Sequence, residues 1–423
     1  MLTAIAASQL VIAPTPRAHF GIGAIGRLPD ILRDVGGDTV LVVTDAALAA
    51  TPVITSVTQV LDTAGIPATV FSGVHPNPTT GDLATGAGAA ATVAQAWSAA
   101  HPGPPRIALV AVGGGSPIDA AKGIAVAAVN PQRGRDLDYR NQFAVKALPI
   151  VAVPTTAGTG AETNAFGVVT DPVAHRKFYV GHASSMPAAA ILDPGLTVGL
   201  PPLATAATGM DALTHALESY LSVRANPWAD GIALQVIRMI AAYLPRACAD
   251  GMDLEARSQM LLAAHMAGVA MATTGLGLCH AVGHSLGGRF DIAHGVALSM
   301  LLPHVLRYNA QVCRDRLDDV ALALGLSDTG GSNAEAAIEA IASLADQIGL
   351  TQRMADLGIT GTDFGQIAAD ALDDEVLANT PRRPTADDIQ AILLAARQLS
   401  CRRRPRRLLR PLTRALIRRR SRP

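Results

Sequence analysis

Three histidines lie close together in one short stretch of the chain, residues 275–303, with the sequence GLGLCHAVGHSLGGRFDIAHGVALSMLLP. His280 and His284 are four residues apart, and on a helix this spacing places both rings on the same face. His294 follows a Gly-Gly break and begins a second apolar run, so the chain can fold back and bring it near the first pair. A single histidine in such a setting is more often a hydrogen-bonded core residue. Three together favour a metal site, because neutral imidazole is the commonest metal ligand.

Further donors lie upstream, in the segment GMDALTHALESY, where Asp211 and His215 are also four residues apart on a predicted helix. Together with His280 and His294 they would supply one carboxylate and three imidazoles. Because this set has no thiolate, it suits a borderline divalent ion such as Fe²⁺ or Zn²⁺, without choosing between them. Two alternatives stay open: Asp211 could cap its helix, and His284 could line the site without binding the ion.

A glycine-rich loop is a candidate phosphate-binding site. The apolar run 106–112 predicts a buried strand, and it leads directly into Gly113, Gly114, Gly115 and Ser116 at the start of a helical stretch. Glycines let the backbone approach a phosphate, and the free N–H groups and dipole of a helix N-terminus favour an anion. The loop does not have the GxGxxG fingerprint, and a tight turn that needs left-handed residues is the alternative.

Asp45 and a threonine-containing loop could contact the same nucleotide. Asp45 follows the predicted strand 39–44, and an acid at this end of a strand can bind a ribose 2′-hydroxyl and repel a 2′-phosphate. Capping of the following helix is the alternative role. Thr155 and Thr156 belong to the loop 154–164, which could close over a pyrophosphate or a nicotinamide, or serve as an ordinary crossover.

The elements that carry these residues change in kind near residue 200. Upstream, short apolar runs alternate with helical stretches, and the strands are continuously apolar, as buried parallel strands are. This alternation predicts a doubly wound parallel sheet in an α/β dinucleotide-binding domain, residues 1–200. Residues 201–400 show only helical periodicity, and they predict an all-helical domain that carries the metal site and the catalytic residues.

Composition and charge argue against other classes of protein. The chain has 423 residues, enough for two domains, and 49% are hydrophobic but only 3% aromatic. Residues 401–423 contain 11 arginines and no acid, and the rest of the chain has 23 basic against 34 acidic residues, a net charge of −11. We therefore expect a disordered basic tail on an acidic body. The acidic body and the lack of interleaved aromatic residues argue against a nucleic-acid-binding protein, the class that the tail alone would suggest.

The cysteine spacing and the apolar runs bear on where in the cell the protein is expected. Cys248, Cys279, Cys313 and Cys401 show no CxxC spacing, which favours a reducing environment. The N-terminal segment lacks a basic start and is interrupted by prolines, so it does not resemble a signal peptide. No uninterrupted apolar run has the length and flanks of a membrane span. We expect a soluble cytoplasmic protein without a membrane partner.

The candidate residues lie in a series of motifs that resembles the iron-containing (group III) alcohol dehydrogenase family over roughly residues 20–398. The resemblance implies a dinucleotide-binding α/β domain followed by an all-helical one, with a single divalent ion that is usually iron and sometimes zinc. The motifs, in chain order, are GGGSPIDAAKG, PTTAGTGAE, DPGLTVGLPP, ATGMDALTHALESY, GLGLCHAVGHSLGG, HGVALSMLLPHVLRYN and NTPRRPTADDI.

The resemblance also implies roles for individual residues. His284 would face the nicotinamide and the substrate as the catalytic residue. The chain departs from the family pattern at Leu298, where relatives usually have asparagine, and in its basic tail. Four residues would hold the ion, namely Asp211, His215, His280 and His294. Ten residues would lie near the dinucleotide, namely Asp45, Asn77, Gly113, Gly114, Gly115, Ser116, Asp119, Thr155, Thr156 and Lys177.

The function implied is NAD-dependent, metal-dependent interconversion of a small primary alcohol and its aldehyde, with hydride transfer in the cleft between the two domains. Asp45 matches the acid that makes such enzymes prefer NAD, and we expect a homo-oligomer, a dimer or larger. The alternative is a polyol or diol dehydrogenase of the same superfamily, of the lactaldehyde reductase or 1,3-propanediol dehydrogenase type. Such an enzyme would need polar pocket residues, whereas Phe166 and Met271 suggest an apolar wall.

Overall fold

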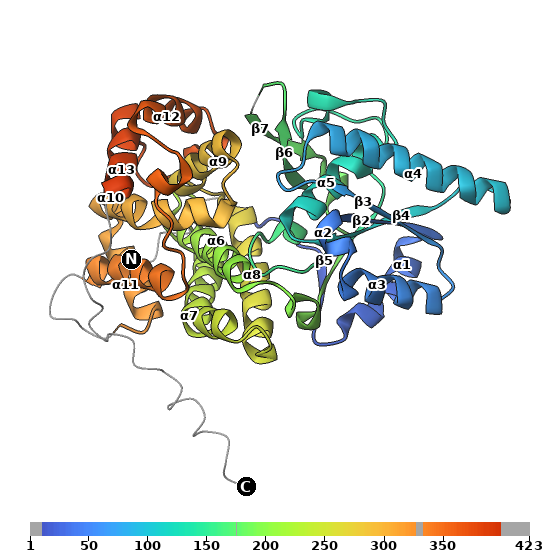
Figure 1. Cartoon of the computed structure of the whole chain (residues 1–423), viewed down its shortest axis with the longest axis horizontal. Coiled ribbons are helices and arrows are strands. Elements are labelled where there is room, and N and C mark those ends of the chain that lie inside the picture. The colour runs from blue at the N-terminus through green and yellow to red at the C-terminus, as the bar shows by residue number, and fades with distance from the viewer. Residues whose placement is uncertain (1–10, 175, 327–332, 399–423) are drawn as a thin grey trace, which may run out of the picture.

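The computed structural model describes residues 11–174, 176–326 and 333–398. Figure 1 shows an α/β half built from the first part of the chain beside a helical half built from the second. The last strand ends at Leu192 and the first long helix of the helical half begins at Pro202, on either side of the predicted boundary at residue 200. The predicted basic tail, residues 401–423, lies outside the described residues.

A six-stranded sheet forms the centre of the α/β half. Its strands are β1 (Arg17–Phe20), β2 (Thr39–Asp45), β3 (Ala68–Val74), β4 (Ile107–Gly113), β5 (Ile150–Pro154) and β8 (Ala189–Leu192). The strand order is β1-β8-β5-β4-β2-β3, and all neighbours are parallel. β2, β4 and β5 are buried along almost their whole length, because their residues are apolar on both faces.

Helices cover both faces of this sheet. Val40 and Val42 of β2 pack in one core with α1 and α3. Leu41 and Val43 pack in the other core with α4 and α5. Successive side chains of a strand point to opposite faces, so one apolar strand contributes to two cores. The predicted doubly wound fold is confirmed, although the sequence analysis missed β1. The covering helices are α1 (Leu28–Val35), α3 (Pro52–Thr63), α4 (Thr80–Ala100) and α5 (Gly115–Ala127).

Two further strands, β6 (Phe166–Asp171) and β7 (Arg176–Gly181), form a separate antiparallel hairpin. They make a two-stranded sheet of their own, separate from the six-stranded one. The buried amine of Lys122 on α5 donates to the carbonyl oxygens of Ala161 and Phe166, at 2.7 and 2.6 Å. These bonds hold the start of the hairpin against α5, on the side of the α/β half that faces the helical half (Figure 1).

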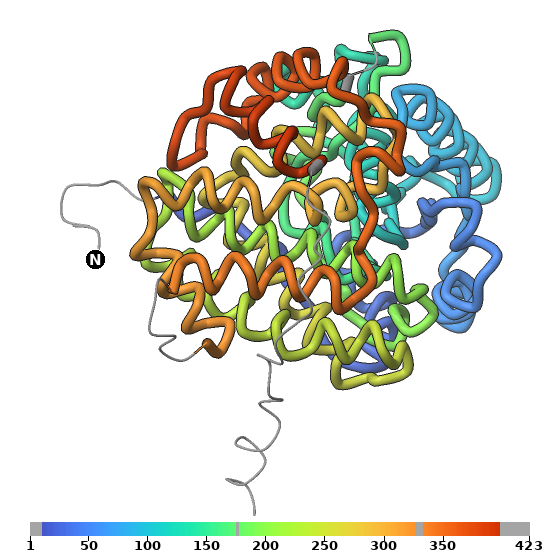
Figure 2. Tube along the Cα trace, turned by 60° about the vertical axis from the view of Figure 1, so that its left-hand side comes forward, coloured from blue at the N-terminus to red at the C-terminus, as the bar shows by residue number. Residues whose placement is uncertain are grey.

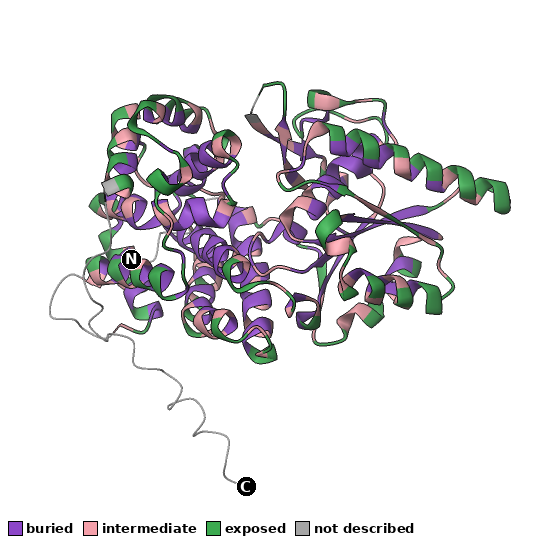
Figure 3. Cartoon of the chain, in the orientation of Figure 1, coloured by how far each residue is buried: buried purple, intermediate pink, exposed green. Residues whose placement is uncertain are grey.

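The helical half packs around α6, which contacts α7, α8 and α10 and is buried along almost its whole length (Figure 3). α10 and α11 run side by side across this half (Figure 2). A helix buried on all sides carries polar side chains only where other groups satisfy them, so the polar residues of α6 need partners. The helices are α6 (Pro202–Leu221), α7 (Pro227–Ala249), α8 (Leu254–Thr274), α9 (Leu278–Phe290), α10 (His294–Ala323), α11 (Asn333–Gln347), α12 (Phe364–Leu372) and α13 (Ala386–Gln398).

Among the described helices, α7 alone is long and apolar enough to cross a membrane by itself, and α8 and α9 would qualify together except that they are bent by 107°. α7 packs along α6 and α8, and Val236, Ile240 and Leu244 are fully buried in the core of the helical half. Packing inside the protein therefore accounts for its apolar composition.

Candidate metal centre and cofactor cleft

Helix α6 carries two donors of the predicted metal site. Asp211 and His215 lie one turn apart, and Nε2 of His215 is 3.2 Å from Oδ1 of Asp211. Both side chains are almost fully buried, because α6 runs through the centre of the helical half. Asp211 and His215 therefore lie on one face of α6, as their spacing of four residues predicts.

The other two donors come from α9 and α10. Nε2 of His280 lies 3.5 Å from Oδ1 of Asp211, and Nε2 of His294 lies 3.8 Å from the same oxygen. The chain turns between the two helices at Asp291, whose backbone is left-handed with a φ of 52°. This turn returns the start of α10 to the face of α9 that carries His280. The predicted fold-back is present, but it does not lie at the Gly-Gly pair, because α9 continues through Gly287 and Gly288 to Phe290.

The four side chains fit a divalent ion. Oδ1 of Asp211 and Nε2 of His280 are buried and have no hydrogen-bond partner within the described part of the chain. Leaving such atoms unsatisfied is costly, whereas a cation would satisfy them. Donors on a tetrahedral ion with bonds of about 2.1 Å are about 3.4 Å apart, close to the distances of 3.2, 3.5 and 3.8 Å measured from Asp211. His294 is the outermost member, with 28% of its side chain exposed.

The electrostatics of this centre favour positive charge. Burial opposes the charged form of Asp211, but the imidazoles around it outweigh burial and hold the pKa of that carboxyl below its usual range. Burial lowers the pKa of His215 to about 4, so its ring is neutral at pH 7. Burial alone would lower the pKa of His280, but the carboxylates of Glu218 and Asp211 raise it to about 9.

Glu218 is a residue of the centre that the sequence analysis missed. It lies on α6 one turn after His215, and its Oε2 is 2.6 Å from Nδ1 of His280. The same carboxylate accepts the backbone N–H groups of Gly277 and Cys279, at 2.9 and 2.6 Å. Its spacing of three residues from His215 and seven from Asp211 puts it on the same helix face, and this signal could have found it.

His284 has a carboxylate partner of its own. Nδ1 of His284 is 2.7 Å from Oδ2 of Asp374, which lies just before the 3₁₀ turn Glu375–Asn379. Burial opposes the charge of Asp374, but His284 outweighs it and lowers the pKa of this carboxyl. The tightest donor group consists of Asp211, His215 and His280, and it includes neither His294 nor His284. His294 nevertheless approaches Oδ1 of Asp211 to 3.8 Å, whereas His284 pairs with Asp374. This geometry agrees with the prediction that His284 lines the site.

One cavity of about 500 Å³ joins the metal donors to part of the predicted nucleotide site. All four predicted ligands and His284 line it, from the helical half. The α/β half contributes five of the predicted cofactor residues, namely Asn77, Gly115, Ser116, Asp119 and Lys177. The N-terminus of α5 at Gly115 therefore opens into the same cleft as the candidate metal centre.

The remaining predicted cofactor residues are not among the residues that line this cavity. The N–H of Thr155 donates to the carbonyl of Gly113 at 2.9 Å. A Cβ added at Gly114 would lie 3.2 Å from the side chain of Thr156, so these two residues pack closely together. Asp45 adopts the alternative role, because its Oδ1 accepts the N–H of Leu48 at 2.8 Å and caps the short helix α2 (Ala46–Ala49). The cap uses only one carboxylate oxygen, so the other could still bind a ribose hydroxyl, and that contact stays a prediction.

Lys177, Asn77 and Asp291 form a chain of hydrogen bonds across the cleft. The amine of Lys177 on β7 donates to Oδ1 of Asn77 at 2.9 Å, and Nδ2 of Asn77 donates to Oδ1 of Asp291 at 2.7 Å. Asp119 accepts the N–H of Val168 at 3.0 Å and so ties β6 to α5. Three of the predicted cofactor residues thus shape the cleft before any ligand is considered.

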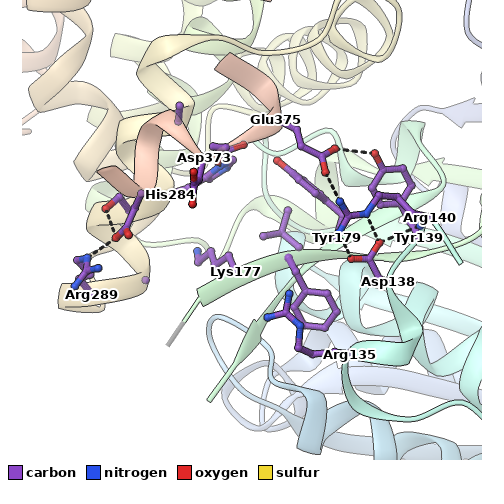
Figure 4. Close-up of a pocket in the computed structure, with 17 residues that line it drawn as sticks. Arg135, Asp138, Tyr139, Arg140, Lys177, Tyr179, His284, Arg289, Asp373 and Glu375 are labelled. Atoms are coloured by element: carbon purple, nitrogen blue, oxygen red, sulfur yellow. Dashed lines mark hydrogen bonds and ion pairs between the residues drawn. The ribbon is translucent and has the colours of Figure 1, made fainter. Parts of the chain in front are cut away.

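A second, strongly polar cavity of about 310 Å³ adjoins the first and shares Lys177, Tyr179 and His284 with it. Figure 4 shows charged side chains from both halves around it. Glu375 of the helical half accepts hydrogen bonds from the hydroxyl of Tyr139 at 2.9 Å and from Arg140 at 3.0 Å. The two halves are therefore bonded to each other at the rim of the cleft.

Comparison with known proteins identifies the family. Residues 14–194 match the family described as iron-containing alcohol dehydrogenase, and residues 205–397 match the description Fe-containing alcohol dehydrogenase family, C-terminal. The chain belongs to the iron-containing alcohol dehydrogenase family. As a member of it, the protein is an oxidoreductase of alcohols and aldehydes.

Individual relatives span nearly the whole of this family member. Lactaldehyde reductase of Escherichia coli (strain K12) is 36% identical over 388 residues, 90% of this chain and 98% of that protein. NAD-dependent methanol dehydrogenase of Bacillus methanolicus is 36% identical over 387 residues, 89% of this chain and 97% of that protein. A crystal structure of 1,3-propanediol oxidoreductase has a TM-score of 0.85 at 37% identity, covering 92% of this chain and 100% of that one.

The predicted family, fold class and enzyme class are confirmed for this alcohol dehydrogenase. The domain limits and the roles of individual residues stay predictions.

Proposed function

We propose that this alcohol dehydrogenase interconverts a small primary alcohol and its aldehyde, using one divalent metal ion and NAD, in the cleft between its two halves. The observation that carries the proposal is the convergence of three imidazole Nε2 atoms on Oδ1 of Asp211, at 3.2, 3.5 and 3.8 Å. This cluster opens into the cavity that the N-terminus of α5 also reaches.

When bound, the divalent ion supplies Lewis-acid polarisation of the alcohol oxygen, and NAD accepts a hydride. The chain's own residues hold these groups, exclude water and move a proton. His284 suits the last role, because Asp374 holds its Nδ1 and its Nε2 has no hydrogen bond to any described residue. Phe166 and Met271 line the cavity and provide the predicted apolar wall, which keeps water from the reacting carbon.

The proposed cofactor and metal rest on two further observations. Asp45 places a carboxylate at the end of β2, beside β4 and its glycine loop, where a negative charge would repel a 2′-phosphate. A relative of similar length is named an NAD-dependent methanol dehydrogenase. The family name supports Fe²⁺ as the ion, while a set of one carboxylate and three imidazoles also suits Zn²⁺.

A diol dehydrogenase is the second candidate. Relatives named lactaldehyde reductase and 1,3-propanediol oxidoreductase favour it. Arg224 and Asn379 line the cavity and could contact a second hydroxyl group. Phe166 and Met271 on the same cavity favour a simple alcohol. A cytoplasmic location and a homo-oligomeric state stay predictions from the sequence.

Metal-stripped protein, reconstituted without oxygen with Fe²⁺ or with Zn²⁺, tests the proposal. Ethanol, propan-1-ol, propane-1,2-diol and propane-1,3-diol would each be assayed with NAD and with NADP. We expect activity only after reconstitution, with a higher kcat/KM for NAD and for the simple alcohols. Full activity of the stripped protein would refute the metal requirement, and a tenfold preference for a diol would favour the second candidate.

A further inference from the structure

We propose that Glu218 is a positioning residue for the metal centre, which holds His280 with its proton on Nδ1 and its Nε2 lone pair directed at the ion. The inference rests on the proposed function, because it assumes that His280 binds a metal. It concerns a residue that binds neither the ion nor the substrate and acts only through its neighbours.

The carboxylate of Glu218 accepts three hydrogen bonds from one turn of the chain, and both of its oxygens take part. It accepts Nδ1 of His280 at 2.6 Å and the backbone N–H groups of Gly277 and Cys279 at 2.9 and 2.6 Å. Glu218 is only 7% exposed, so no bulk water competes for these bonds. All three donors lie in the first turn of α9 or immediately before it, where the N–H groups of a helix lack partners inside the helix.

Nε2 of His280 indicates the purpose of the hydrogen bond from Nδ1 to Glu218. Nε2 is buried without a hydrogen-bond partner in the described part of the chain, and it lies 3.5 Å from Oδ1 of Asp211. A histidine binds a metal through the nitrogen that carries no proton, and a carboxylate on the opposite nitrogen fixes that tautomer and the orientation of the ring. Glu218 thereby selects Nε2 as the donor.

Helix α6 therefore contributes twice to the centre. Asp211 and His215 reach the ion from it directly, and Glu218 on the same face orients the ligand that comes from α9. Because Glu218 also binds the N–H groups at the start of α9, the position of this helix and the direction of His280 depend on one side chain.

A purely structural role is the competing explanation, in which Glu218 only caps α9. Asp374 offers a matched control, because it also holds the Nδ1 of a histidine, His284, one turn later on α9. His215, His280 and His294 all approach Oδ1 of Asp211 to 3.8 Å or less, whereas the ion-pair partner of His284 is Asp374. Removing the charge of Asp374 should therefore disturb a histidine in the same helix without weakening metal binding.

The experiment compares wild type, Glu218→Gln and Asp374→Asn as full-length proteins stripped of metal. Zn²⁺ would be titrated against a competing chelator, and the melting temperature would be measured with and without Zn²⁺. Glutamine has one acceptor oxygen and an NH₂ group that only donates, so it cannot serve all three donors and holds the tautomer of His280 less firmly. We expect the affinity of Glu218→Gln for Zn²⁺ to fall about 10–100-fold. Asp374→Asn should bind Zn²⁺ as wild type does.

Each result decides between the explanations. Equal Zn²⁺ affinity of Glu218→Gln and wild type, with a lower metal-free melting temperature, would leave Glu218 as a helix cap and overturn the inference. An equal loss of affinity in both variants would also overturn it, because the effect would not be specific to His280. If wild type itself binds no Zn²⁺ or Fe²⁺, the proposed metal centre fails first. Should Glu218→Gln not fold, Glu218→Asp keeps the charge but shortens the reach, and wild-type affinity in that variant would overturn the inference equally.

Discussion

At the scale of single residues, His280 and His284 show how the surroundings separate two equivalent positions. They lie one turn apart on α9, and each has a carboxylate on Nδ1, Glu218 for the first and Asp374 for the second. Nε2 of His280 is buried against Asp211, whereas His284 lies between the two cavities and lines both. The same side chain can therefore bind the ion in one position and face the substrate in the other.

Replacing each of these histidines by alanine should have different effects. His280→Ala should purify nearly free of metal and inactive, because the remaining donors lose the ion that they share. His284→Ala should keep the metal and lose about 10²–10⁴-fold in turnover, the usual effect of removing an acid–base group. Elemental analysis normalised to protein, together with steady-state kinetics, measures both. Metal loss in His284→Ala but not in His280→Ala would reverse the two assignments.

The charge of Asp45 should determine the preference for NAD. Asp45→Gly should lower kcat/KM for NAD relative to NADP by about one to two orders of magnitude, because the repulsion of a 2′-phosphate is removed. The structure adds a control, since Asp45 also caps α2. Asn caps helices as well as Asp does, so Asp45→Asn removes the charge and keeps the cap. An unchanged cofactor ratio in Asp45→Asn would leave Asp45 as a helix cap only.

At the scale of elements, the proposed metal centre depends on how closely α10 approaches α6. Gly295 follows His294 directly, and a Cβ added there would overlap the backbone carbonyl of Ala207 on α6. Backbone atoms cannot move aside as a flexible side chain can, so any larger residue must push the two helices apart. The glycine therefore allows His294 to come within 3.8 Å of Asp211.

Gly295→Ala should consequently weaken both the fold and the metal site. We expect a loss of about 1–3 kcal/mol in the free energy of unfolding of the metal-free protein, as overpacking typically causes. Metal content should fall as well, because His294 moves with the start of α10. Urea unfolding and elemental analysis would measure the two effects. Gly231→Ala in α7 is the matched control, since its added Cβ meets no atom within 4 Å and alanine favours a helix by up to about 1 kcal/mol. Wild-type metal content and stability in Gly295→Ala would show that the approach of the helices is not limiting.

At the scale of the whole molecule, hydrogen bonds at the rim of the cleft connect the two halves. Glu375 bonds to Tyr139 and Arg140, and Asn77 bonds to Asp291. These groups are partly exposed, and exposed ion pairs contribute only about 0.2–1 kcal/mol each. Such contacts are too weak to maintain the fold, and we expect them to act instead on the opening of the cleft.

Glu375→Ala should therefore change ligand exchange more than stability. We expect the dissociation rate of NADH to rise about two- to fivefold, which corresponds to about 0.5–1 kcal/mol, with little change in melting temperature. Stopped-flow displacement of bound NADH measures the rate. Glu335→Ala removes an ion pair with Arg307 inside the helical half and should leave the rate unchanged. Equal rates for both variants and wild type would show that Glu375 does not hold the cleft closed.

The sequence alone predicted the parallel sheet, the change to helices near residue 200 and four candidate metal donors, which the structure brings together. These features can be predicted because their signals are local in the sequence. Apolar periodicity marks strands and helices, and a spacing of four positions places two donors on one face of a helix wherever that helix packs. Spacing could not say which of His280 and His284 binds the ion. The family resemblance implied that His280 binds it and that His284 faces the substrate.

Only the tertiary structure decided which partner each polar group has. Glu218 and His280 are 62 residues apart, and His284 and Asp374 are 90 apart, so no local pattern connects them. The same holds for Asp45 and for the β6–β7 hairpin. The local sequence allows Asp45 to cap a helix or to bind a ribose, and it does not say which sheet β6 and β7 join. Packing of α9 against α6 brings Glu218 and His280 together, because a buried polar group that lacks a partner is costly.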